Sequence, residues 1–221
     1  MKKNNPLIIY EDNHLIAAYK LSGQTVQPEP NKPRSLEEQV KIYLKEKYQK
    51  EGAVFLGVIH RIDMPVSGLV LFAKTSKALT RMNEIFHDRL VQKIYLAKVE
   101  GKPKLKTELI THWLRRDENK NFTKAFTSEV KGAQIAKLTY EIIESNARFS
   151  LLKINLHTGR KHQVRAQLSA LGCPIAGDVK YGASQPMADQ SIALQSYSIS
   201  FIHPVKLEPI ELILNKSVLK L

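Results

Sequence analysis

The chain has 221 residues, of which 43% are hydrophobic, and this is enough apolar material for one substantial core. Lys and Arg number 34 against 21 Asp and Glu, so the formal net charge is +13, which fits a polyanionic partner or a generally basic surface. Every apolar run is far shorter than the roughly 20 residues of a membrane helix, so we expect a cytoplasmic protein with no membrane partner. The single cysteine, Cys173, excludes an internal disulfide and is expected to be buried.

The N-terminal part predicts two strands and a helix. Residues 7–20, LIIYEDNHLIAAYK, form two short strands about a polar turn, and a short Pro-rich loop follows at 27–35. The next stretch, SLEEQVKIYLKEKYQK, begins with Ser35 and Glu38 in capping-box spacing and continues with apolar residues at helical intervals. We therefore expect an amphipathic helix that begins at Ser35.

Residues 57–79, GVIHRIDMPVSGLVLFAKTSKAL, contain an unusual polar interruption. Arg61 and Asp63 lie between two apolar runs, VFLGVI and GLVLFA, that are typical of buried strands. A second helix is expected from Ser76, and its apolar positions keep helical spacing. These positions are Leu79, Met82, Ile85, Phe86 and Leu90.

Strands dominate the next part of the chain. They are QKIYLAKVEG, TELITHWL, TKAFTSEV, QIAKLTYEIIE and RFSLLKINLH. Consecutive strands with few helices between them predict an α+β fold with a mixed, mostly antiparallel sheet and peripheral helices. A third helix, KHQVRAQLSALG, precedes a Gly-containing loop and two closing strands, SIALQSYSISFIH and PIELILN. With no repeat and no linker, one domain spanning 1–221 is expected.

The positive charge is localised in part of the chain. The segment from Ser145 to Gly177 has no Asp or Glu. It carries Arg148, Lys153, Arg160, Lys161 and Arg165. A segment of one sign favours a binding face for phosphates, because neutralising them releases counterions.

Asp63 has two interpretations on local evidence. A short acidic side chain before MPVSG can simply hydrogen-bond the backbone of a turn. It can also be a catalytic group, because loops that follow a rigid strand commonly carry such groups, and His60 and Arg61 lie close by. Local spacing favours the turn interpretation.

The sequence lacks the motifs of several common enzyme classes. There is no phosphate-binding loop, no HExxH or GxSxG motif and no dinucleotide fingerprint, so cofactor chemistry is not expected. A glycosidase needs a second carboxylate near Asp63, and none lies nearby apart from Glu51 and Glu84, although a distant one stays possible. His157 and His162 have no neighbouring Cys or acid, so a metal site is not expected.

Four ordered blocks carry a family resemblance. HRIDMPVSGLVLFAKT is similar to the HRLDxxTSG motif of the RluA family of RNA pseudouridine synthases, and KIYLAKVEG is similar to its K-x-Y-x-A-x-V-x-G strand. LHTGRKHQVRAQLSALGCPIAGDVKYG resembles TGRxHQIRxHLxxxGxPIxGDxxYG, and ALQSYSISFIHPV resembles the closing LHAxxLxFxHP. The similarity runs from about Leu7 to Pro209.

The resemblance implies a pseudouridine synthase fold and assigns catalytic roles. Asp63 corresponds to the essential aspartate, Arg165 to its charge partner and Tyr95 to the tyrosine that stacks on the uracil. From its strand position alone, Tyr95 would be an ordinary core or cross-strand aromatic. An Arg165 guanidinium close to Asp63 would keep the carboxylate ionised, as the reaction requires.

The resemblance also implies which residues contact RNA. Arg61 lies against the target-base site in the family and can fill the gap left by a flipped-out uridine. The other expected RNA-contacting residues are Lys20, His60, Arg160, Lys161 and His162. Lys20 and Gly23 remain from the family's K-P-x-G motif, whose proline is absent here. Val66 replaces the commoner Thr, and Gln167 replaces the commoner His.

The implied reaction detaches uracil from ribose at N1 and rejoins it through C5, without a cofactor. Asp63 can act on the sugar at C1′ or C2′ or on the base at C6, and the sequence does not choose among these routes. We expect a stand-alone monomeric enzyme, without an S4 domain, that acts on ribosomal or transfer RNA. The alternatives are a catalytically silent RNA-binding protein of the same fold and, less favoured, a base-excising glycosidase.

Overall fold

The computed structural model describes residues 5–215, which form two compact units. One unit contains residues 5–91 and 196–215, and the other contains residues 92–195. The chain therefore leaves the first unit once and returns to it with its last strands. The prediction of a single catalytic domain over 1–221 concerns both units together and stays a prediction.

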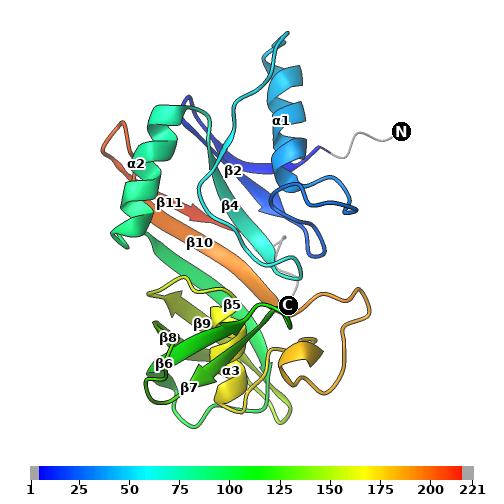
Figure 1. Ribbon diagram of the computed structural model, residues 1–221, viewed down its shortest axis with the longest axis vertical. Helices are drawn as coiled ribbons and strands as arrows, with labels where there is room; N and C mark the ends of the chain where they lie inside the picture. Colours follow the sequence, from blue (N-terminus) through cyan, green and yellow to red (C-terminus); the bar gives the residue numbers. More distant parts are fainter. Residues whose placement is uncertain (1–4, 216–221) are drawn as a thin grey trace. The chain divides into compact units, whose positions relative to one another are not determined.

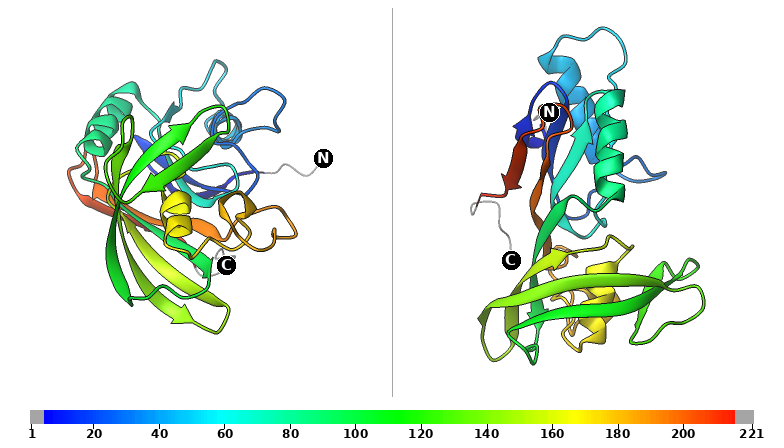
Figure 2. Two further views of the ribbon diagram at one scale, coloured as in Figure 1. Left: turned by 60° about the horizontal axis from the view of Figure 1, so that its bottom comes forward. Right: turned by 90° about the vertical axis from the view of Figure 1, so that its left-hand side faces the viewer.

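The first unit is a sheet with two helices (Figures 1 and 2). Its strand order is β1-β2-β4-β10, with β11 paired to β10 and β3 paired to β4. The β1–β2, β2–β4, β3–β4 and β10–β11 pairings are antiparallel. The strands are β1 (Leu7–Glu11), β2 (Leu15–Lys20), β3 (Gly57–Val58), β4 (Ser67–Ala73), β10 (Leu194–Ile202) and β11 (Pro209–Ile213).

Both helices of the first unit begin where the sequence predicts. Helix α1 (Leu36–Lys47) has Ser35 as its N-cap, and the complete capping box with Glu38 is present. Helix α2 (Ser76–His87) is capped by the Thr75 side chain, which accepts from the backbone N–H of Ala78. The expectation that Leu90 continues the apolar stripe is wrong, because Arg89 is left-handed, with φ 59°, and Leu90 is 67% exposed.

The core of the first unit lies between α2 and the sheet. Buried apolar side chains of β2 and β4 pack with Met82 of α2 and with residues of β10 and β11. Strand β2 is buried at every position, as is β4 after Ser67, because alternate side chains point to opposite faces and both faces are covered. These strands form the rigid support for the loops that follow them.

The second unit is a five-stranded antiparallel sheet with one α-helix and a short 3-10 helix, Val179–Tyr181. Its order is β5-β9-β8-β6-β7. Helix α3 (Gln163–Ala170) packs against β6 and β7, where Leu114, Ala136, Ala166 and Tyr181 form a buried cluster (Figure 1). The strands are β5 (Gln92–Glu100), β6 (Thr107–Asp117), β7 (Phe122–Phe126), β8 (Gln134–Ser145) and β9 (Phe149–Leu156).

The predicted α+β fold is confirmed, and several strands differ in extent from the prediction. Only Gly57 and Val58 of the VFLGVI run pair with β4, and β7 ends at Phe126 although strand was expected to Val130. Cys173 is buried and free, as expected. No helix within residues 5–215 is long and apolar enough to cross a membrane.

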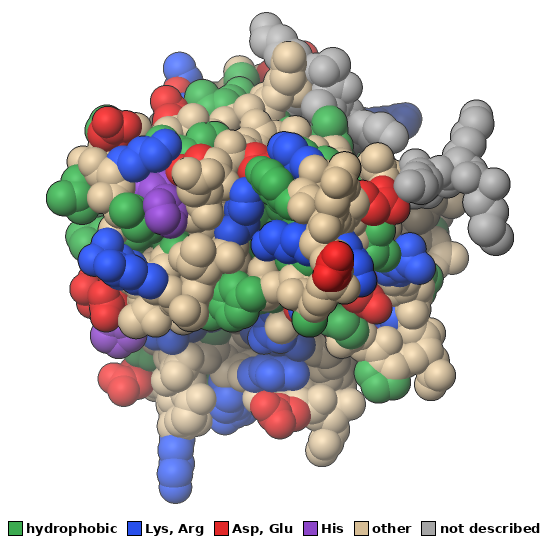
Figure 3. Space-filling view, turned by 90° about the horizontal axis from the view of Figure 1, so that it is seen from above, with side chains coloured by type: hydrophobic (Ala, Val, Ile, Leu, Met, Phe, Trp, Pro, Cys, Tyr) green, Lys and Arg blue, Asp and Glu red, His purple; other side chains and the backbone are tan. Residues whose placement is uncertain are grey.

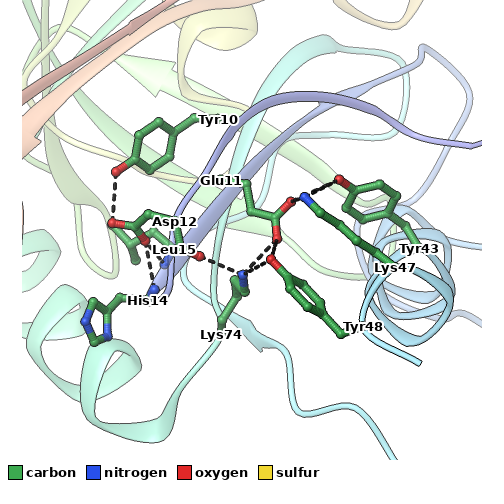
Figure 4. Close-up of polar contacts among 9 residues, drawn as sticks. All are labelled: Tyr10, Glu11, Asp12, His14, Leu15, Tyr43, Lys47, Tyr48 and Lys74. Carbon is green, nitrogen blue, oxygen red and sulfur yellow. Dashed lines mark hydrogen bonds and ion pairs between the residues drawn. The ribbon is translucent and has the colours of Figure 1, made fainter. Parts of the chain in front are cut away.

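Helix α1 is tied to the first unit's sheet by one carboxylate (Figure 4). Glu11 Oε2 accepts from Tyr43 Oη at 3.0 Å and from Lys47 Nζ at 2.7 Å, both on α1. Glu11 Oε1 accepts from Tyr48 Oη at 2.7 Å and from Lys74 Nζ at 2.8 Å. Burial raises the pKa of Glu11, but these donors outweigh it and lower the pKa to about 2.

Replacing Glu11 with Gln should destabilise the first unit by on the order of 2–3 kcal/mol at neutral pH. Because the folded pKa is below the ordinary 4.5, this stabilisation is present above about pH 4.5 and is lost as the pH falls towards 2. Urea unfolding at several pH values measures both effects. The exposed Glu51→Gln serves as the control, and equal pH dependence in Glu11→Gln and the unaltered protein would contradict the prediction.

Candidate active site

Asp63 lies in a tight turn between β3 and β4. Its carbonyl accepts from the backbone N–H of Val66 at 3.0 Å, so Asp63–Val66 forms a hydrogen-bonded turn. The Asp63 side chain is half-buried, whereas Met64 beside it is exposed. The backbone of Asp63 thus closes the turn, and the role of its carboxylate stays a prediction.

Lys20 holds this turn through a hydrogen bond from its buried side chain. It is the last residue of β2 and is fully buried. Its Nζ donates to the carbonyls of Leu21 at 2.9 Å, Gln24 at 2.7 Å and Met64 at 3.0 Å. Burial lowers the pKa of Lys20 to about 7, and the negative charge of Asp63 opposes that shift. The three carbonyls also favour the charged form, because only an ammonium has three N–H donors.

Two further contacts hold the same turn. Gly23 donates its backbone N–H to the Met64 carbonyl at 2.9 Å, and Ser22 Oγ donates to the Pro65 carbonyl at 2.8 Å. Gly23 has φ 79°, which a residue with a side chain rarely adopts. The segment YKLSG therefore fixes the carbonyls that follow Asp63, although it lacks the family's proline.

Gly68 allows β4 to approach β10 immediately after the turn. Its φ is 124°, and a Cβ at this position would collide with the backbone of Ser196. A side chain at residue 68 would push β4 away from β10, and the turn that carries Asp63 would move with it. This explains the glycine of the MPVSG stretch physically.

Arg61 and His60 differ in exposure. Arg61 is exposed, and its Nη1 donates to Gln27 Oε1 at 3.3 Å. His60 is half-buried: its Nε2 accepts from the backbone N–H of Leu71 at 3.1 Å, and its ring stacks on Phe86 with a centroid distance of 5.3 Å. Arg61 is thus accessible to a large ligand. The His60 ring instead contacts β4 through Leu71 and α2 through Phe86.

Tyr95 lies on β5, the first strand in the order of the second unit's sheet. It lies opposite Ile154 of β9 and is 9% exposed. On the other edge of β5, Lys98 pairs through its backbone with Ala193 and Ala176, so β5 is held on both sides. The backbone that carries the Tyr95 ring is therefore rigid.

Arg165 is buried in α3 and has an acidic partner that the sequence analysis missed. Its Nε and Nη2 donate to the two carboxylate oxygens of Asp178 at 2.7 and 2.8 Å. The guanidinium lies 4.7 Å from the centre of the Tyr181 ring. Such a bidentate pair fixes the orientation of the planar group. The signal for Asp178 and Tyr181 was their place in GDVKYG, within the block quoted for the family resemblance.

His162 is also part of this buried network. Its Nδ1 lies 2.8 Å from Tyr181 Oη, which accepts from the backbone N–H of Thr123 at 2.9 Å. The Tyr181 ring stacks on Phe122 with centroids 4.6 Å apart. His162 itself is 7% exposed and left-handed, with φ 55°. In the free protein, His162 therefore supports the start of α3 and the β7 strand.

The TGRK turn presents its cations to solvent. The Gln163 side chain holds the turn from inside, because Oε1 accepts from Thr158 Oγ1 at 2.7 Å and from the Arg160 backbone at 3.0 Å. Lys161 is exposed and Arg160 is partly exposed. Lys and Arg also occur across the face shown in Figure 3, interspersed with acids, so net charge alone does not locate a binding surface.

The predicted site residues are divided between the two units. The first unit contains Lys20, His60, Arg61 and Asp63. The second unit contains Tyr95, Arg160, Lys161, His162 and Arg165. Among the described residues, no group of three or more His, Cys, Asp or Glu side chains is placed to hold a metal ion.

Comparisons with known proteins agree with the motifs. Residues 14–170 match the family model described as RNA pseudouridylate synthase. The ribosomal large subunit pseudouridine synthase D of Zymomonas mobilis is 33% identical over 90% of this chain, which spans 65% of that relative's length. The tRNA pseudouridine synthase C of Haemophilus influenzae is 34% identical over 92% of this chain and 90% of its own.

Two further likenesses extend this result. The dual-specificity RNA pseudouridine synthase RluA of Vibrio vulnificus is 30% identical over 89% of this chain and 78% of its own. The solved structure of human RNA pseudouridylate synthase domain containing 4 covers 95% of this chain and 88% of its own, with a TM-score of 0.78. At 22% identity that structure shows the fold alone. The chain therefore belongs to the RNA pseudouridylate synthase family of isomerases, and the predicted RluA-type membership is confirmed.

Proposed function

We propose that this chain converts uridines of ribosomal or transfer RNA to pseudouridine, with Asp63 as the catalytic carboxylate. In this reaction the C1′–N1 bond breaks, a C1′–C5 bond forms, the C5 proton leaves to solvent and N1 gains a proton. The family membership and the names of the relatives support the activity and the two kinds of RNA. No redox step occurs, so the proposed reaction needs no cofactor.

One observation carries the assignment of Asp63. A half-buried carboxylate stands on a turn whose carbonyls are fixed by Lys20, Ser22 and Gly23. A side chain used only to make a turn would not need such support, since the turn's own hydrogen bond is made by the backbone. Pre-positioning of a reacting group is worth several orders of magnitude in rate.

The remaining roles follow from the resemblance. We propose that Tyr95 stacks on the flipped-out uracil and that Arg165 is the charge partner of Asp63. The buried Asp178 pair supports this proposal for Arg165, because it fixes the orientation of the guanidinium through Nε and Nη2. Arg61, Arg160 and Lys161 contact RNA, while Lys20, His60 and His162 position the surrounding elements. The proposed enzyme works as a cytoplasmic monomer.

Asp63→Asn should abolish isomerisation and leave RNA affinity nearly unchanged, because the change removes the charge of the reacting group and almost no volume. Tritium release from RNA that carries 5-tritiated uridine, taken from cells lacking the protein, measures the reaction, and filter binding measures affinity. Tritium release by the Asn variant would refute the role of Asp63. An unaltered protein that binds this RNA without any release would instead be the silent binding module.

Lys20→Met should reduce kcat at least about tenfold while changing RNA affinity little, because three hydrogen bonds are lost, one of them to Met64 in the turn, and Lys20 is too deeply buried to reach phosphates. The milder Ser22→Ala, which removes only the bond to Pro65, should show a smaller loss of the same kind. Thermal unfolding verifies that both variants fold. A weaker affinity with a flatter salt dependence would mean that Lys20 contacts RNA directly.

Neutralising Arg160 and Lys161 together to Gln should weaken RNA binding and reduce its dependence on salt. Each lost phosphate contact lowers the slope of log K against log salt by about 0.7–0.9. Binding titrations between about 50 and 200 mM salt measure this slope. An unchanged slope would show that the TGRK turn is not part of the binding face.

A further inference from the structure

The hairpin formed by β6 and β7 places two cations directly opposite each other. Arg115 and Lys124 are cross-strand partners in the antiparallel register, and both are exposed. Directly opposed like charges destabilise a strand pair. Among the residues that the structure describes, neither of them forms an ion pair that would relieve this repulsion.

Both cations also lie against one aromatic ring. Arg115 Cζ and Lys124 Nζ are each 5.2 Å from the centre of the Phe126 ring. These contacts hold the two side chains near the same half-buried residue, at the cost of bringing their charges together. An anionic ligand that contacts both cations would therefore reduce the repulsion between them most.

The hairpin is connected to the TGRK turn and to the loop after α3. Thr123 Oγ1 donates to the Lys161 carbonyl at 3.0 Å, and Lys180 Nζ donates to the Lys120 carbonyl at 3.1 Å. Arg160 Nε donates to the carbonyl of Ile135, on the neighbouring strand β8, at 3.4 Å. We name the two opposed cations of this hairpin, Arg115 and Lys124, the hairpin patch.

The nearby acids do not neutralise the opposed pair. Asp117 accepts from the backbone N–H of Lys120 at 3.0 Å and so stabilises the hairpin turn. Glu118 lies 3.4 Å from Arg116, the neighbour of Arg115 that points to the other face of the strand. Both acids therefore have partners at the tip of the hairpin, and neither forms an ion pair with Arg115 or Lys124.

We propose that the hairpin patch binds the phosphate backbone of the substrate RNA outside the target uridine, with Arg115 and Lys124 gripping adjacent phosphates. This inference rests on the proposed function and adds a second contact region to it. Adjacent phosphates bound by the two cations offset the repulsion between them, so removing both cations should weaken RNA binding without lowering fold stability.

The double variant Arg115→Gln and Lys124→Gln tests both effects. The Kd for RNA at about 0.1 M salt should rise on the order of tenfold or more, and the salt slope should fall by roughly 1.4–1.8 for two lost contacts. Without RNA, the midpoint of thermal unfolding should stay the same or rise, because a like-charge pair has been removed. A purely structural role would instead lower the unfolding midpoint.

The matched control is Lys102→Gln with Lys104→Gln, which makes the same charge change in the exposed loop before the opposite end of β6. An affinity and salt slope in the hairpin variant equal to those of this control would overturn the inference. So would a weaker affinity accompanied by a lower unfolding midpoint and an unchanged slope. Tritium release by the unaltered enzyme tests the proposed function separately, since its absence refutes that function whatever the slopes are.

Discussion

The burial of one ammonium group is the constraint on which the carboxylate turn depends. Lys20 is fully buried, and desolvating a charge costs several kcal/mol unless polar groups replace the lost water. The three carbonyls around Nζ provide this replacement, and one of them belongs to Met64, next to Asp63. The charge is stable only while the turn stays in place, so the cost of burying Lys20 becomes a restraint on the position of Asp63.

The second unit also contains a buried cation whose lost hydration is replaced by protein groups, but those groups are different. There the buried cation is Arg165, and its desolvation is offset by the Asp178 carboxylate and the face of Tyr181. The hydroxyl of Tyr181 is itself bound by His162 and by the backbone of Thr123. The orientation of the Arg165 guanidinium is thus fixed by Asp178 and Tyr181, and Tyr181 is in turn held by His162 and Thr123.

Local signals in the sequence predicted local structure well. The capping box of Ser35 and Glu38 located α1, and alternating apolar residues located the strands of the second unit, because both depend on neighbours in the chain. The burial of Lys20 and of His162 was not predictable, since their partners are backbone carbonyls and a tyrosine from other segments. The prediction for Leu90 was wrong for another reason. Its apolar side chain fits the helical spacing, but Arg89 adopts a left-handed conformation, so the helix ends before Leu90.

The division of the chain has a consequence for its synthesis. The core of the first unit joins Leu15 and Leu71 to Ile199 and Leu212, whereas the second unit is one continuous stretch. Domains fold as units while the ribosome still holds the chain, so the second unit can close its core first. The turn of Asp63 gains Ser196 behind Gly68 only after the whole second unit has been synthesised. A nascent chain that has just completed its second unit therefore displays its surface cations before the support of its carboxylate turn is complete.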